Sequence, residues 1–343
     1  MQSDIKPSRA RRGSRGRKGN KRANATGLQQ IAWQVPRNTD TPIAPLPPEG
    51  VAAIHHTAMR ILEEVGVEFL NLEAVDTLRQ AGCTILNETR DGALVKMDRA
   101  FVMDKIAHAP AKFLITPRNL DRQIIIGGQN MVFGSIASPP NCSDLDRGRR
   151  PGDRQSHQDL VKLSQFFNCI HFIGGYPVEP VDSHASVRHL DCLHDQLTLS
   201  DKVVHAYSLG AGRVDDVIEM VRIAGGLTEQ EFAQTPRMFT NINSTSPLKH
   251  DFPMLDGLMR LSRCGQPTIV TPFTLAGAMS PITLAGTVAQ SIAEALCAIV
   301  LIQIINPGCP CAIGTFSSNV DMKTGAPAFG TPEYMRATQM TGQ

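Results

Sequence analysis

The sequence predicts an α/β fold, a (β/α)8 TIM-type barrel with about six of its eight units present, behind an N-terminal helical and hairpin module. From residue 131 onward, six short apolar runs each end in a cluster of Gly, Ser, Thr, Pro or Asn, and a helical pattern follows. Their starts lie 38, 34, 35, 30 and 43 residues apart. This is the period of a strand, a loop and a return helix, and repeated βα units predict a parallel sheet. The runs are Met131–Ser135, Cys169–Gly174, Val203–Ser208, Met238–Asn243, Thr268–Phe273 and Cys311–Thr315.

Six units do not close a barrel of eight. The segment Pro332–Gln343 has the pattern of a helix opening, so we expect about 70 further residues, or two more units, in a complete barrel. The alternative is a doubly wound open sheet, which six strands can also build. No G-x-G-x-x-G follows the first run, and the short period contains no long reversal, so the sequence favours the barrel.

Residues 48–130 predict the N-terminal module. Apolar positions from Val51 to Val65 follow helical spacing and end at Gly66, and a second helix covers Leu72–Ala81. Asp91-Gly92 separates two strand-like runs and predicts a hairpin between Thr84–Asn87 and Ala93–Met97. Asp98 is the expected N-cap of a third helix, and two short strands are expected at Phe113–Thr116 and Gln123–Ile126.

Residues 1–47 predict a disordered basic tail and linker. Residues 6–22 are dense in Arg, Lys and Gly and contain no acid, so they cannot bury enough apolar surface to fold. The segment is interpreted either as a solvated extension or as a contact for nucleic acid or another anionic surface. No aromatic side chain interleaves with the basic residues, which does not support a specific nucleic-acid reader.

Three helices are expected between the strands of residues 131–343. Asp159–Phe167 places Leu160, Leu163 and Phe167 on one side, and Asp215–Ala224 carries a valine face. Ser280-Pro281 predicts the N-cap and first residue of a long helix ending at Asn306. Because this helix is apolar almost all round, we expect it to be buried, partly between subunits of a homo-oligomer.

The composition indicates a cytoplasmic protein without a membrane segment. The longest apolar stretch, Ala295–Ile305, is too short to span a bilayer, and no apolar segment typical of a signal peptide follows the basic start. The eight cysteines include no C-x-x-C and are expected to be reduced thiols.

The loops after the strands build the active site of a barrel, so the residues at the six strand ends are the candidate site. They are rich in hydroxyl, amide and aromatic groups and poor in histidine and lysine. His184, His189 and His194 recur at intervals of five, which spreads them around a helix and does not support zinc. No nucleophile elbow is present. The site candidates are Tyr176, Tyr207, Asn243, Thr271, Phe273, Thr315, Phe316 and Asp321.

Three segments carry a resemblance to a known family. They are IHHTAMRILEEVGVEF at 54–69 with its following Ala-Gly-Cys, TPFTLAGAMSPITLAG at 271–286, and GTFSSNVDMKTGAPAFGTPE at 314–333. Together they resemble the trimethylamine:corrinoid methyltransferase superfamily, from about Pro48 to Gln343. The resemblance implies a (β/α)8 barrel that transfers a methyl group from trimethylamine or a quaternary amine such as glycine betaine to Co(I) of a separate corrinoid protein, with no cofactor bound directly.

The resemblance is to a member without pyrrolysine, although the position that carries pyrrolysine in trimethylamine enzymes is expected beyond Gln343. For such a substrate, Tyr176, Tyr207, Phe273 and Phe316 offer aromatic faces to the ammonium group. Phe273 and Phe316 are alternatively core residues that close the barrel.

The remaining candidates are assigned to the charged ends of such a substrate. Asp144 or Asp321 is a possible counter-charge, and hydrogen bonds from Asn243, Thr271 or Thr315 suit a betaine carboxylate. For Asp144 the alternative is pairing with neighbouring arginines. The alternative function is a non-catalytic or inactive barrel fragment that binds a small cationic ligand.

Overall fold

The computed structural model describes residues 28–208 and 210–343. The basic segment 6–22 lies outside the described residues, so its predicted disorder is not addressed by the structure. Residues 33–343 form one compact unit. Within that unit, residues predicted as linker make specific contacts: Arg37 forms an antiparallel bridge with Asn130, and Leu46 N–H donates to Oε1 of Gln343 at 3.0 Å.

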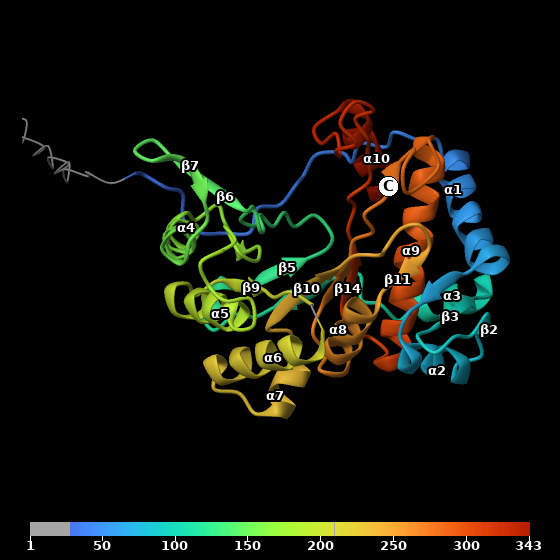
Figure 1. The fold of residues 1–343 in the computed structure, drawn as a ribbon, viewed down its shortest axis with the longest axis horizontal. Coiled ribbons are helices and arrows are strands. Elements are labelled where there is room, and N and C mark those ends of the chain that lie inside the picture. The colour runs from blue at the N-terminus through green and yellow to red at the C-terminus, as the bar shows by residue number, and fades with distance from the viewer. Residues whose placement is uncertain (1–27, 209) are drawn as a thin grey trace, which may run out of the picture. The chain divides into compact units, whose positions relative to one another are not determined.

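The predicted helices and hairpin of the N-terminal module are present (Figure 1). The first helix passes into a π-helical turn at Ile61–Val65 and ends at Gly66, whose φ of 90° favours glycine. The side chain of Asn71 caps the second helix and that of Asp98 caps the third. The elements are α1 (Pro48–Arg60), β1 (Val67–Phe69), α2 (Leu72–Gln80), β2 (Thr84–Leu86), β3 (Ala93–Lys96) and α3 (Arg99–Ile106).

This module shares its sheet and its core with the rest of the unit. Its four strands lie in the order β11-β1-β3-β2, and β11 (Lys249–His250) pairs parallel with β1. One hydrophobic cluster joins residues 58–102 to residues 242–311, and the long helix α9 (Leu284–Ile305) contacts α1, α2 and α3. Apolar burial therefore connects the N-terminal module to residues that are distant in sequence.

Five of the six predicted runs form one parallel sheet. The hydrogen-bonded order is β14-β12-β10-β9-β8, which is the order of the strands along the chain. The strands are β8 (Phe172–Ile173), β9 (Val203–His205), β10 (Met238–Ile242), β12 (Thr268–Val270) and β14 (Cys311–Ile313). A doubly wound sheet reverses its strand order, and these five strands show no reversal.

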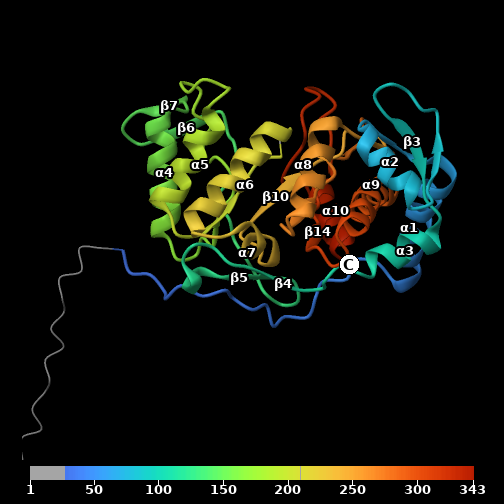
Figure 2. The ribbon, with the colours of Figure 1, turned by 90° about the horizontal axis from the view of Figure 1, so that it is seen from below.

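The connecting helices lie in a row that also follows the chain (Figure 2). Each helix of this row contacts the next one in the row. Valine side chains of α6 pack on Val204 of β9 and on Ala206, which follows that strand, in a separate cluster. The helices of the row are α4 (Arg154–Phe166), α5 (Arg188–Leu199), α6 (Ala211–Gly225), α8 (Phe252–Arg263) and α9.

Side chains on the face of the sheet opposite the helices pack on a hairpin. Val203 and Phe239 join Ile115 and Ile124 in one buried cluster. The hairpin consists of β4 (Phe113–Ile115) and β5 (Ile124–Ile126), which pair antiparallel as predicted. The two faces of the sheet are therefore covered by different elements, helices on one and this hairpin on the other.

Smaller elements lie between the main ones. A hairpin of β6 (Asn141–Asp144) and β7 (Gly148–Pro151) precedes α4. The others are the 3-10 turn Leu120–Arg122, α7 (Glu229–Gln234), β13 (Leu275–Ala276), β15 (Ser318–Asn319) and α10 (Pro332–Gly342).

Three local predictions were wrong. The run Met131–Ser135 is not a strand, because its only ladder contact is a parallel bridge from Gly134 to Phe172. Helix α4 does not bury Leu163, which is 51% exposed. It buries polar residues such as His157, whose Nδ1 contacts the Val178 carbonyl oxygen at 3.2 Å, since buried polar groups are stable once hydrogen-bonded.

The third error concerns the start of α9, which begins three residues later than predicted. Its N-cap is Thr283, whose hydroxyl accepts from the Gly286 N–H at 3.3 Å. The helix is long and apolar enough to cross a membrane, yet 83% of its most apolar window is buried inside the described structure. Helix α9 is therefore buried as a core helix, as predicted from its apolar residues on all sides.

Candidate active site

The best-formed group of predicted site residues lies at the ends of β8 and β9. The rings of Tyr176 and Tyr207 meet edge to face, with centroids 4.8 Å apart. The Tyr207 hydroxyl group is hydrogen-bonded to the Ser138 hydroxyl, and the Tyr176 N–H donates to it at 3.4 Å. Burial raises the pKa of both phenols. The Tyr207 ring is thus oriented by hydrogen bonds from two neighbouring loops, and the Tyr176 ring packs against it.

Gly175 makes this arrangement possible. Its φ is 106°, and a Cβ at this position would lie 2.4 Å from the Tyr207 hydroxyl oxygen and 3.1 Å from Nδ1 of His205. Only glycine leaves room for the tyrosine and the histidine to cross the end of β8.

His205 is a buried neutral histidine beneath the tyrosine pair. Burial lowers its pKa to about 4. Its Nε2 accepts the backbone N–H of Asn241 at 3.1 Å, which places the proton of the neutral ring on Nδ1. Nδ1 has no hydrogen-bond partner among the described residues. The buried ring of His205 is therefore satisfied by a hydrogen bond at one nitrogen only.

A pocket of about 190 Å³ opens beside the two tyrosines. Glu179 and Arg188 in its wall form an ion pair at 2.7 Å. Arg213 is a second cation in the wall, and its Nη2 donates to the Ala185 carbonyl oxygen at 3.3 Å. The described residues place no carboxylate within ion-pairing distance of Arg213, so the lining carries an excess positive charge.

Sequence reasoning missed both arginines of this wall. Arg188 lies in the first turn of α5 and Arg213 in the first turn of α6. Each arginine could have been found from its position at the start of the helix that follows a strand. The N-terminus of such a helix lies on the same side of a parallel sheet as the carboxyl ends of the strands.

The candidates after β12 and β14 form a second group. Phe273 and Phe316 lie with ring centroids 4.9 Å apart, and the aromatic contacts continue to Phe329 and Tyr334. Phe316 is 36% exposed and Phe273 is half-buried. Strands β9 and β12 are separated by β10, which puts the two groups about 10 Å apart across the sheet.

The three small polar candidates have different surroundings. Thr271 packs against Gly314, where a Cβ would lie 2.3 Å from the threonine hydroxyl oxygen. Thr315 has a buried hydroxyl group that lacks a partner among the described residues. Asn243 follows β10 directly and is half-buried. Thr315 is therefore the one of the three that offers a free buried hydrogen-bonding group.

The two aspartates are occupied by local partners. Asp321 is exposed, and its carboxylate accepts from the Lys323 N–H at 2.9 Å and the Thr324 hydroxyl at 3.0 Å. These hydrogen bonds lower the pKa of Asp321. Asp144 pairs with Arg147 at 3.1 Å and Arg150 at 2.7 Å, as the alternative interpretation predicted. The structure does not bring Asp321 into contact with either aromatic group.

Sequence reasoning also missed a buried carboxylate behind the end of β10. Glu294 of α9 is fully buried, and it accepts hydrogen bonds from the hydroxyls of Ser244 and Ser246, the Leu248 N–H and the Gln290 amide. It anchors the loop that follows Asn243. Within the described ranges, no group of three or more His, Cys, Asp or Glu side chains suits a metal ion.

Comparison with known proteins agrees with the resemblance read from the sequence. The chain is 36% identical over 283 residues to a glycine betaine methyltransferase of Desulfitobacterium hafniense, covering 82% of this chain and 58% of that protein. It is 28% identical to a trimethylamine methyltransferase MttB of the same species, covering 83% of this chain and 57% of that protein. For a proline betaine:corrinoid methyltransferase of Eubacterium limosum the identity is 26%, with 82% and 58% covered.

The chain thus spans a little over half the length of these relatives. Among solved structures, a phospho-2-dehydro-3-deoxyheptonate aldolase from Thermotoga maritima matches at 12% identity and a TM-score of 0.27, over 71% of this chain and 64% of that one. So low a score carries no argument. The trimethylamine methyltransferase family description matches residues 11–343. The chain belongs to the trimethylamine methyltransferase (MTTB) family.

Proposed function

We propose that this chain binds a methylated amine and positions one of its methyl groups for transfer to Co(I) of a corrinoid carried by a separate protein. Family membership supports this proposal, as do relatives named for glycine betaine, trimethylamine and proline betaine. The observation that carries it is the tyrosine pocket, in which Tyr176 and Tyr207 stand edge to face beside a charged wall. Aromatic faces bind quaternary ammonium groups without hydrogen bonds.

We further propose that the sheet belongs to a (β/α)8 barrel whose strand ends face the substrate. The support is a parallel strand order that follows the chain, with the connecting helices in the same sequence. In this arrangement, the residues after β8 and β9 hold the substrate, and those after β12 and β14 lie across from them.

The charges of the pocket favour a betaine over trimethylamine. Glu179 and Arg188 neutralise each other, and Arg213 remains as an excess cation. A lone ammonium ion would be repelled by Arg213, whereas a betaine brings a carboxylate that can pair with it. The two tyrosine rings then face the methylated nitrogen at the other end of the same molecule.

The proposed transfer requires little acid–base catalysis from these residues. The corrinoid supplies the nucleophile for the methyl group. When the N–CH3 bond of a quaternary amine breaks, the electron pair stays on nitrogen and a neutral tertiary amine leaves without needing a proton. The tyrosines and Arg213 therefore act by binding and orientation, which is a large contribution in a two-component reaction.

The test supplies the chain with a Co(I) corrinoid protein and, in turn, glycine betaine, proline betaine, carnitine and trimethylamine. With glycine betaine we expect dimethylglycine to form in step with the absorbance change of the corrinoid. Tyr176→Leu should raise the KM for the betaine about thirtyfold, because a desolvated cation–π contact contributes about 2 kcal/mol. Phe252→Leu, at an exposed phenylalanine at the start of α8 and outside this pocket, is the matched control.

Absence of methyl transfer from all four amines would reject the proposed reaction. Calorimetric binding of glycine betaine without turnover would instead support the alternative, a non-catalytic protein that binds a small cationic ligand. Transfer from trimethylamine alone would reject the role given to Arg213.

A further inference from the structure

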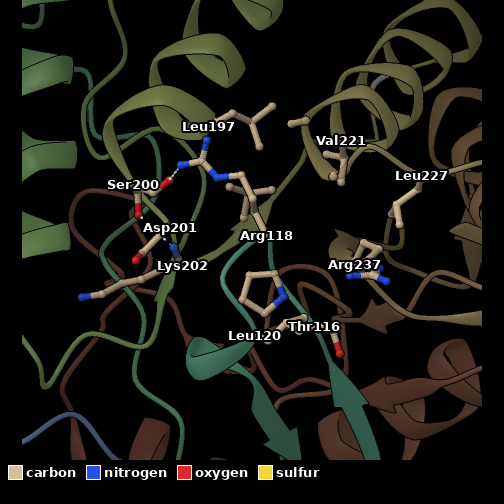
Figure 3. A pocket seen from close by; sticks show the side chains of 14 residues that line it. Thr116, Arg118, Leu120, Leu197, Ser200, Asp201, Lys202, Val221, Leu227 and Arg237 are labelled. Atoms are coloured by element: carbon tan, nitrogen blue, oxygen red, sulfur yellow. Dashed lines mark hydrogen bonds between the residues drawn. The ribbon is translucent and has the colours of Figure 1, made fainter.

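A second pocket lies at the opposite ends of the strands. Its volume is about 310 Å³, at the lower limit of typical small-molecule sites. Lys202 comes directly before β9 and Arg237 directly before β10, while Arg118 follows β4 (Figure 3). These are the amino ends of the strands, so the pocket is separate from the tyrosine pocket.

Two arginines in the wall of this pocket have no carboxylate partner among the described residues. Arg118 donates one hydrogen bond, from Nη2 to the Ser200 carbonyl oxygen at 3.3 Å. The Nε of Arg237 is buried and has no partner. A guanidinium group has five N–H donors, and leaving a buried one unsatisfied is costly. The donors of these two arginines are therefore available to a ligand.

The only acid in the wall does not neutralise these arginines. Asp201 accepts from the side-chain amides of Asn119 at 2.7 Å and Gln165 at 2.8 Å, and it pairs with Arg122 at 3.7 Å. Its carboxylate is thus engaged by partners outside the pocket lining.

The third cation in the wall is also engaged elsewhere. The Lys202 ammonium donates to the carbonyl oxygens of Ser164 at 2.6 Å and Phe167 at 2.7 Å. Figure 3 shows this side chain directed away from Arg237. The positive charge that remains in the pocket comes from the two arginines.

The rest of the wall is apolar. Leucine and valine side chains face the space beside the arginines, among them Leu120, Leu197, Val221 and Leu227. A hydrated inorganic ion gains nothing from such a surface, whereas an alkyl or ring group gains about 25 cal/mol for each Å² that it removes from water. The wall therefore suits a ligand with a charged head and an apolar body.

We propose that this pocket binds a small organic anion, with its carboxylate or phosphate head on one of the two arginines, which lie on opposite sides of the cavity (Figure 3), and its apolar body against the leucines and valines. This ligand is distinct from the methylated amine and does not depend on the proposed transfer reaction. Arginine forks match the planar oxygens of both kinds of head.

Calorimetric titration of the 343-residue chain with hexanoate, hexyl phosphate and inorganic phosphate tests this site. We expect at least one alkyl anion to bind at least tenfold more tightly than inorganic phosphate, and its head identifies the preferred group. At least one of Arg118→Gln and Arg237→Gln should weaken that binding at least tenfold, and the variant that does so identifies the arginine that holds the head. Arg149→Gln, at an exposed arginine without a carboxylate partner, should leave it unchanged.

Thermal melts establish that each variant is folded. If Arg237→Gln does not melt cooperatively, Arg237→Lys replaces it, with an intermediate loss expected because lysine keeps the charge but not the fork. The proposal is overturned if neither alkyl anion binds at millimolar concentration, if both glutamine variants bind normally, or if inorganic phosphate binds as tightly as hexyl phosphate.

Discussion

The buried carboxylate of Glu294 offers the sharpest test of how the candidate site is supported. Its Oε1 accepts from the Leu248 N–H and the Gln290 amide, both at 2.8 Å. Its Oε2 accepts from the hydroxyls of Ser244 and Ser246. In Glu294→Ala the two serines can bond to each other, since their oxygens lie 3.2 Å apart, but the Leu248 N–H and the Gln290 amide lose their acceptor.

The expected cost follows from those two donors. An unsatisfied buried donor costs about 1–3 kcal/mol, and the space left by the carboxyl group adds to it, so Glu294→Ala should lose about 3–5 kcal/mol. Glu294→Gln should lose about 1 kcal/mol or less. Its amide oxygen replaces Oε1, and its NH2 can donate to the serine hydroxyls, which rotate to accept.

Urea unfolding followed by circular dichroism measures these differences by linear extrapolation. Glu49→Ala, at an exposed glutamate of α1, is the control and should stay within about 1 kcal/mol of the parent chain. The reasoning is refuted if glutamine at 294 is as destabilising as alanine, or if alanine costs no more than the control.

Three further predictions address the strand ends and their packing. Burial holds the pKa of His205 at about 4, whereas a histidine in the unfolded chain has a pKa of about 6.5, so between these pH values the unfolded chain binds one more proton than the folded chain. The free energy of unfolding should therefore fall by about 3 kcal/mol as the pH is lowered from 6.5 to 4. His205→Asn should make the measured free energy of unfolding nearly constant over that range. Gly257→Ala should destabilise by about 1–3 kcal/mol in urea unfolding because its Cβ would lie 1.7 Å from the Ser208 hydroxyl oxygen, whereas Gly212→Ala, with nothing within 4 Å, should be neutral or stabilising; equal effects would contradict this. Tyr207→Phe should lower the melting temperature, reflecting about 1–2 kcal/mol for the two lost hydrogen bonds to Ser138 and the Tyr176 N–H, and an unchanged melting temperature would show that these bonds do not stabilise the fold.

Much of the fold was predictable because its signals are local. Asp98 before an apolar helical period predicted a cap, and Asp91-Gly92 between two strand-like runs predicted a hairpin; both predictions are confirmed. The spacing of the apolar runs predicted the parallel strands, and five of the six are present. The prediction of a strand at Met131–Ser135 was wrong because an apolar run forms a strand only where a neighbouring strand pairs with it along its length.

The candidate site was predictable only in part. Tyr176 and Tyr207 were expected at neighbouring strand ends, and the structure brings their rings together. Asp321 was expected to be a counter-charge, but its carboxylate is occupied within its own turn. Arg213 and Glu294 were missed, because a charged residue within a helical pattern indicates an exposed position until its neighbours are known.

The sequence by itself determined where most strands and helices alternate and which residues stand at the strand ends. Those features depend on capping, turn conformation and apolar period within a few residues. The tertiary structure alone decided which charges are neutralised and which side chains line one cavity, as for the ion pair of Glu179 with Arg188 and for Arg118 and Arg237 around one pocket. The physical reason is that desolvation and pairing depend on contacts between segments far apart in the chain, and no local pattern records them.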